Sequence, residues 1–163
     1  MLSADRFTKV AGIFIDPTVF VDDDGQAYFI LGKSECLLCQ AECRYGFADG
    51  EVSKVEQTIE SFGSPGPDKR EKGKKYKDIY TEGPWLHKRG GTYYLSYAAG
   101  GVPEHIAYSM SDTPTGPWKY MGEIMPLQDT GSFTNHCGVT DYKGNSYFFY
   151  HTGKLPRWGW FRT

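Results

Sequence analysis

Four residues with chemically useful side chains stand at one common offset from three similar turns. Nine residues before a turn glycine, the chain has Asp16, Glu82 and Asn135, and His136 follows the last of these. Paired carboxylates are what glycosidic cleavage requires, since one protonates the leaving oxygen while the other activates water or attacks the sugar. Taken singly, Asp16 before Pro17 reads as a turn starter, and Glu82 before Gly-Pro as a strand breaker. The shared offset favours acid–base chemistry instead.

The elements that must position these residues are three repeated hairpins. VFVDDDGQAYFILG, WLHKRGGTYYLSYAAG and GVTDYKGNSYFFYHTG each combine an apolar strand, a polar turn with glycine, and a strand rich in Tyr and Phe. The turn glycines, Gly25, Gly91 and Gly144, recur after 66 and 53 residues, which leaves room for about four short strands per unit. In the second unit the expected strands are Trp85–Lys88, Thr92–Ala98, His105–Ser111 and Trp118–Met121.

Repeated all-β units favour a propeller over a sandwich or a barrel. The innermost strands of a propeller line its axis, so equivalent positions on successive blades converge there. We expect one domain over residues 1–163, an unclosed propeller of about three blades. Its units lie at about 13–63, 82–125 and 132–163, with a solvated basic loop at 64–78.

Composition and charge argue against two classes of binding partner, nucleic acids and membranes. The formal net charge is -2 over 163 residues, so no broad basic surface predicts binding to nucleic acid or to an anionic membrane. No apolar run approaches the roughly 20 residues that span a bilayer. The first residues, MLSADRFTKVAG, lack the apolar segment of a secretory signal. The location is open, and it is cytoplasmic if Met1 is the true start.

Three of the four cysteines crowd into CLLCQAEC, as Cys36, Cys39 and Cys43, and the fourth is Cys137. Zinc needs four suitably paired ligands, so this spacing favours reduced, partly buried thiols, with a zinc protein as an alternative. The acidic run at 22–24 sits where a hairpin turn is expected, which favours a turn over a metal site. Aromatic residues that could stack on a sugar are expected to fill the core instead, namely Tyr80, Trp85 and Phe133.

Three long segments resemble glycoside hydrolase family 43, in the family's order and over nearly the whole chain. They are IDPTVFVDDDGQAYFILG, TEGPWLHKRGGTYYLSYAAGGVPEHIAYSMSDTPTGPW and GSFTNHCGVTDYKGNSYFFYHTGKLP. The resemblance implies a five-bladed β-propeller, of which this chain would hold the last three blades, incompletely. It also implies an inverting glycosidase that cleaves α-L-arabinofuranosyl or β-D-xylosyl linkages in plant polysaccharides such as xylan.

The resemblance assigns roles to individual residues. Glu82, in the EGP motif, would be the general acid, and Asp16, in the IDP motif, would tune its pKa and orient the substrate. Asn135, His136 and Arg162 would bind substrate. No cofactor is required, although His136 is a candidate for holding a central calcium ion through water, because calcium prefers oxygen ligands. Aromatic walls and the charge of Asp16 are expected to raise the pKa of Glu82, so that it stays protonated near neutral pH.

One member of the family's catalytic set has no counterpart here. The family's general base is an Asp far upstream of the IDP motif, whereas fifteen residues precede Asp16, and Asp5 does not match the base motif. We therefore expect a fragment of a longer gene product that lacks the base. The alternative is a non-catalytic carbohydrate-binding propeller or an inactive truncated product.

Overall fold

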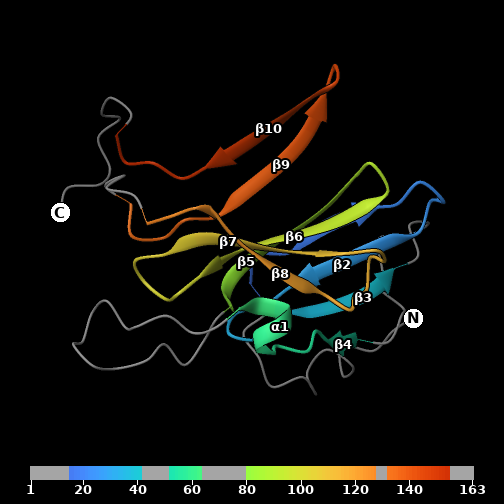
Figure 1. Cartoon of the computed structure of the whole chain (residues 1–163), viewed down its shortest axis with the longest axis horizontal. Coiled ribbons are helices and arrows are strands. Elements are labelled where there is room, and N and C mark those ends of the chain that lie inside the picture. Colours follow the sequence, from blue (N-terminus) through green and yellow to red (C-terminus); the bar gives the residue numbers. More distant parts are fainter. Residues whose placement is uncertain (1–14, 42–51, 64–79, 128–131, 155–163) are drawn as a thin grey trace.

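The computed structural model describes residues 15–41, 52–63, 80–127 and 132–154, which form three antiparallel sheets and one short helix (Figure 1). The first sheet contains β1 (Thr18–Val21), β2 (Ala27–Leu31), β3 (Leu37–Ala41) and β4 (Val52–Lys54). The second contains β5 (Tyr80–Arg89), β6 (Thr92–Ala99), β7 (His105–Ser111) and β8 (Lys119–Met125). The third contains β9 (Cys137–Tyr142) and β10 (Asn145–Tyr150). Within each sheet, strands that are consecutive in sequence are neighbours.

The three predicted hairpins are present. β1 pairs with β2, β5 with β6, and β9 with β10, each antiparallel across a short turn. Their turn glycines adopt nearly the same left-handed backbone, with φ of 84° at Gly25, 82° at Gly91 and 80° at Gly144. Left-handed φ favours glycine because a Cβ would clash there. The repeat seen in the sequence is thus a repeat of one left-handed turn glycine, although the loop between β1 and β2 is longer than the loops of the other two hairpins.

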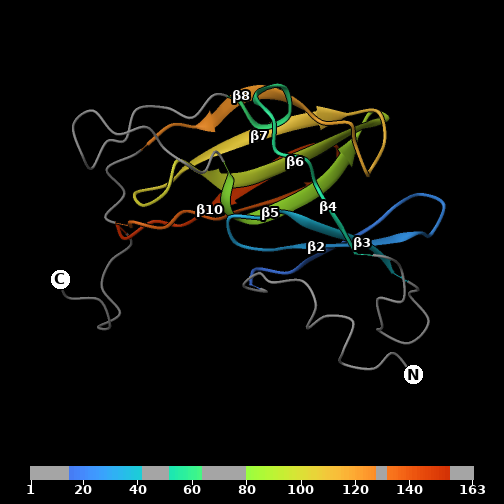
Figure 2. The ribbon, with the colours of Figure 1, turned by 90° about the horizontal axis from the view of Figure 1, so that it is seen from below.

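The sheets meet through their first strands. β5 contacts β1 and β2 on one side and β9 on the other, so the second sheet lies between the first sheet and the β9–β10 hairpin (Figures 1 and 2). Thr18 Oγ1 of β1 donates to Pro84 O of β5 at 2.7 Å. Trp85 Nε1 of β5 donates to Val139 O of β9 at 3.0 Å. These bonds hold the starts of the three sheets side by side.

The larger hydrophobic core lies between the first two sheets. Its centre is aromatic: the rings of Phe62, Tyr80 and Tyr97 contact one another with centroids 4.8–5.9 Å apart. Phe62 enters from α1 (Ile59–Phe62), a single turn that begins with a capping box between Thr58 and Ser61. Tyr80 is fully buried, as expected for a core aromatic.

A smaller cluster joins the second sheet to the third. It contains Ala98, Ile106, Met125 and Cys137, with Trp85 and Phe148 packed against it. Cys36 belongs to the larger core instead, so the described cysteines do not converge on one point. Burial raises the pKa of the Cys36 and Cys137 thiols to about 12, which opposes the thiolates that zinc needs. Cys43 lies outside the described residues.

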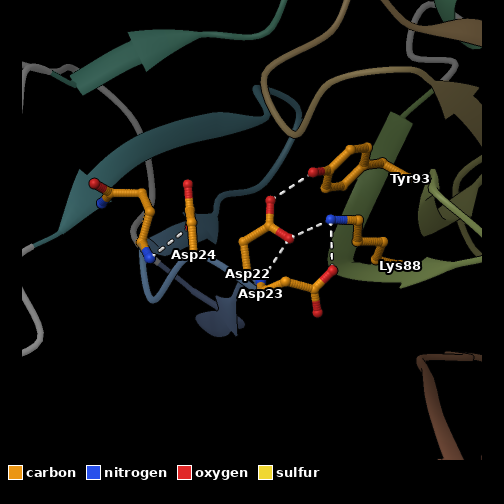
Figure 3. Close-up of polar contacts among 6 residues, drawn as sticks. Asp22, Asp23, Asp24, Lys88 and Tyr93 are labelled. Carbon is orange, nitrogen blue, oxygen red and sulfur yellow. Dashed lines mark hydrogen bonds and ion pairs between the residues drawn. The ribbon is translucent and has the colours of Figure 1, made fainter.

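The acidic run at 22–24 forms the β1–β2 turn and a polar link to the second sheet (Figure 3). Lys88 Nζ lies 2.7 Å from Asp22 Oδ1 and 2.9 Å from Asp23 Oδ2. The Tyr93 hydroxyl donates to Asp22 Oδ2 at 2.5 Å. Asp24 instead accepts from the backbone of its own turn, at Gln26 N. The predicted turn is confirmed, and its carboxylates are occupied by protein donors.

The fold is all-β with sheets that do not close into a ring within the described residues. The basic loop expected at 64–78 lies outside the described residues. Among the helices that the structure does describe, none has the length and apolarity needed to cross a membrane.

Candidate active site

Three of the residues singled out by the sequence meet at the point where the sheets converge. Asp16 lies just before β1, Glu82 within β5, and His136 just before β9. One potential ligand atom from each lies within 4.8 Å of the others. His136 bridges the carboxylates, with Nδ1 3.7 Å from Asp16 Oδ1 and Nε2 3.5 Å from Glu82 Oε1. Each of the three sheets therefore supplies one member of the cluster.

A local irregularity in β5 places Glu82 at this point. The β5–β6 register shifts on both sides of Glu82, and Gly83 has a left-handed φ of 62°. A Cβ on Gly83 would lie 2.9 Å from Cγ of the His136 ring. The Glu-Gly-Pro sequence therefore does more than end regular pairing, because only glycine leaves room for the imidazole beside Glu82. The Glu82 side chain is buried, 8% exposed.

Asp16 adopts an uncommon backbone conformation. Its φ is 54°, in the left-handed region that Asp tolerates better than most residues. Such local strain concentrates at functional sites, where the surrounding structure holds it in place. Gly32 N donates to Ile15 O at 3.0 Å, which ties the backbone just before Asp16 to the end of β2.

Lys33 completes the cluster, and the sequence analysis missed it. Its Nζ lies 2.9 Å from Glu82 Oε2. The turn that carries Lys33 is fixed on the far side by Ser34 N, which donates to Thr81 O at 2.8 Å. Nothing in the spacing of the hairpins points to this lysine, because it belongs to the β2–β3 turn, and only the packing of that turn on β5 reveals it.

The ion pair with Lys33 reverses the expected behaviour of Glu82. Burial raises the pKa of the Glu82 carboxyl, but the Lys33 ammonium and the His136 imidazole together lower it below its ordinary value. The expectation that Glu82 stays protonated near neutral pH is therefore wrong for this state of the chain. It considered the aromatic walls and Asp16 and did not include the lysine.

A second buried carboxyl lies beside the cluster. Glu104, just before β7, is 3% exposed, and burial raises its pKa to about 7. The Glu104 and Glu82 carboxyls shift each other's pKa, and Oε2 of Glu104 accepts from Asn135 N at 2.7 Å. One signal that could have found it is a charged residue, Glu104, directly before the start of the strand HIAYSMS.

The remaining site residues differ in how far the structure describes them. The Asn135 side chain is buried in structural contacts: Oδ1 accepts from His151 N at 3.3 Å, and Nδ2 lies 3.6 Å from Met125 Sδ. Its role in substrate binding stays a prediction. Arg162 lies outside the described residues. Phe133, expected in the core, is 67% exposed, because it sits in the loop before β9 rather than in a strand.

The donor set does not suit direct coordination of calcium. Calcium takes six to eight oxygen ligands, whereas the cluster offers two carboxylates and an imidazole. The ammonium of Lys33 already neutralises Glu82 at 2.9 Å, and it would repel a cation bound there. The Lys33 ammonium thus takes the place beside Glu82 that a directly bound ion would need.

Comparison with known proteins identifies relatives of one kind. The family model for glycosyl hydrolases family 43 matches residues 4–163. A β-xylosidase of Xylanibacter ruminicola is 29% identical in an alignment of length 162. The alignment covers 84% of this chain and 48% of the relative. An arabinoxylan arabinofuranohydrolase of Bacillus subtilis is 31% identical in an alignment of length 153, which covers 83% of this chain and 28% of the relative.

A solved structure agrees with these matches. The α-L-arabinofuranosidase of Clostridium thermocellum superposes with a TM-score of 0.65 at 32% identity, covering 85% of this chain and 41% of the other. The chain therefore spans about half or less of the length of each of these three relatives. Because the family match extends over nearly the whole sequence, this chain belongs to glycosyl hydrolase family 43.

Proposed function

We propose that this chain carries the acid side of a glycoside hydrolase active site that cleaves α-L-arabinofuranosyl or β-D-xylosyl linkages in plant polysaccharides with inversion. The observation that carries the proposal is the meeting of Asp16, Glu82 and His136 within 4.8 Å, one residue from each sheet. The xylosidase and arabinofuranosidase names of the relatives support the substrate class. The complete protein would be a five-bladed propeller whose axis passes through this cluster.

Glu82 is the proposed general acid. It is buried, and Lys33, which pairs with it, has a side chain 43% exposed to solvent. In the resting state Lys33 favours the ionised form, so Glu82 needs a proton before it can protonate the glycosidic oxygen. A sugar that displaces the Lys33 ammonium would remove the charge that lowers the pKa of Glu82, and Glu82 would then take up that proton.

Asp16 is too close to Glu82 to act as the base of an inverting reaction. Inversion needs carboxyl groups roughly 6.5–9.5 Å apart, so that water fits between base and sugar. The facing atoms of Asp16 and Glu82 lie within 4.8 Å, a separation suited to orienting the substrate and to holding His136. We therefore propose that the base comes from outside the described cluster, in the part of the relatives that this chain does not span.

Chemical rescue tests this division of labour. The purified chain is assayed on 4-nitrophenyl α-L-arabinofuranoside and β-D-xyloside, with and without azide. Azide attacks the anomeric carbon in place of base-activated water, the bond to the aryl oxygen breaks, and the Glu82 proton passes to that oxygen. We expect nitrophenol release with azide only, and a loss of about 10²-fold or more in Glu82→Gln. Glu35→Gln, a half-exposed carboxylate paired with Lys54 at 2.6 Å, is the matched control.

Each other outcome has a definite meaning. Release without azide that still depends on Glu82 would show that this chain supplies its own base. No release under either condition, from folded protein, would overturn the proposed acid. Binding of xylotriose in that case, seen as shifts of amide resonances, would favour a carbohydrate-binding role.

A further inference from the structure

Glu104 is a buried carboxyl that joins two loops next to the site. Its backbone N donates to Phe133 O at 3.2 Å, and its Oε2 accepts from Asn135 N at 2.7 Å. It thereby connects the loop before β7 to the segment that carries His136. A carboxyl that is 3% exposed is costly unless its oxygens are satisfied, so two bonds to one short segment indicate a specific role.

The other side of the Glu104 carboxyl faces Glu82. Its Oε1 is buried, and within the described ranges no N–H or hydroxyl group donates to it. The Glu104 carboxyl instead interacts with that of Glu82, since each shifts the pKa of the other, and the two can share a hydrogen bond only when one of them carries a proton. Glu104 takes up that proton more readily than Glu82, since burial raises its pKa to about 7 while the pKa of Glu82 is lowered.

We propose that Glu104 is a positioning residue of this site: its carboxyl ties that of Glu82 to the Asn135 backbone and so sets how Glu82 faces His136. This rests on the proposed role of Glu82 as general acid. Glu82 lies in the second sheet and His136 just before the third, and the Glu104 carboxyl interacts with groups on both sides of that junction. A general acid misplaced by about 1 Å loses much of its effect, which is why such a tie matters.

The geometry selects the variants. Glu104→Gln keeps an oxygen that can accept from Asn135 N and adds an N–H that can donate to Glu82, so it imitates the protonated carboxyl. Glu104→Ala removes both bonds. Glu123→Gln is the control, because this carboxyl is 43% exposed and lies on β8, where it pairs with His105.

The first readout needs no catalysis. In ¹H–¹⁵N spectra, the hydrogen bond to Glu104 shifts the Asn135 amide proton downfield, and the His136 ring nitrogens report the neighbouring carboxylates. We expect Glu104→Gln and Glu123→Gln to retain both signals and Glu104→Ala to lose them. Signals unchanged in Glu104→Ala would overturn the proposal, and so would their loss in a folded Glu104→Gln.

The second readout separates positioning of the acid from general destabilisation. With azide present, rates are compared on phenyl and 2,4-dinitrophenyl glycosides, because a dinitrophenolate leaves without a proton whereas a phenolate needs one. We expect Glu104→Ala to lose at least about tenfold more rate on the phenyl substrate, and Glu104→Gln to recover most of it. Equal losses on both substrates would overturn the proposal. If wild type hydrolyses neither substrate, the proposed function fails, and the spectra alone decide the role of Glu104.

Discussion

Replacing Lys33 by Met should make Glu82 easier to protonate. Opposite unit charges about 3 Å apart attract by about 1.4 kcal/mol in water and by several times more at a low-dielectric site. Because the Lys33 side chain is 43% exposed, solvent screens the pair, and the lower figure applies. About 1.4 kcal/mol corresponds to a factor of about ten in the protonation equilibrium of the carboxyl.

Carbon NMR of chains labelled at the glutamate carboxyls measures this directly. The Glu82 signal, assigned by its absence in Glu82→Gln, should titrate at clearly higher pH in Lys33→Met than in wild type. Lys54→Met is the matched control, since its ammonium pairs with Glu35 and not with Glu82. A Glu82 midpoint that does not move in Lys33→Met would refute the ion pair as the cause of the lowered pKa.

The same pair predicts how stability depends on pH. The pKa of Glu82 is lowered by folding, so its contribution is present above the ordinary carboxyl range and is lost as pH falls through its folded pKa. The pKa of Lys33 is raised, so its contribution is lost only as pH rises through its folded pKa. In urea unfolding, Lys33→Met should therefore cost about 1 kcal/mol at pH 7 and less at strongly acidic pH. An equal cost at both would contradict this reasoning.

Two further substitutions probe the contacts that position the site. Gly83→Ala should lose activity and about 1–2 kcal/mol of stability, because its φ is 62° and its Cβ would lie 2.9 Å from the His136 ring. Gly91→Ala has similar strain but open space around its Cβ, so equal effects on activity would contradict the steric argument. Tyr93→Phe removes the hydroxyl that donates to Asp22 and should cost about 1.5 kcal/mol in urea unfolding, and an unchanged midpoint would show that water replaces this bond.

Much of the fold could be predicted from the sequence repeat, because the residue types in each hairpin turn identify it. The turn glycines and the alternating aromatics are short-range signals. Because Asp16 and Glu82 stand at the same offset from their turn glycines, these signals also predicted that the two residues lie close together. The contacts of Lys33 and Glu104 with Glu82 could not be predicted in this way, for a physical reason. The two residues reach Glu82 from a turn and a loop whose packing on β5 depends on long-range contacts, such as Ser34 N to Thr81 O.

The charge state of Glu82 shows the cost of those two omissions. Burial alone predicts a raised pKa, and that expectation followed from the correct location of the residue. The Lys33 ammonium and the His136 imidazole together outweigh the burial, and no pattern within one hairpin encodes which lysine pairs with Glu82. The location of a carboxyl can therefore be predicted from local sequence more readily than its proton occupancy.

The weak attachment of the β9–β10 hairpin affects how much of the time the site is complete. The hairpin is a two-stranded ribbon with mostly exposed side chains, and Trp85 is a principal contact that fastens it to β5. Segments with little burial open at a small fraction of the global unfolding free energy. His136 lies just before this ribbon, so its imidazole should leave and re-enter the cluster as the ribbon opens and closes, while Glu82 and Lys33 stay in place. The fraction of time that the three-sheet cluster is complete would then be set by a local opening equilibrium, which amide hydrogen exchange along β9 can measure.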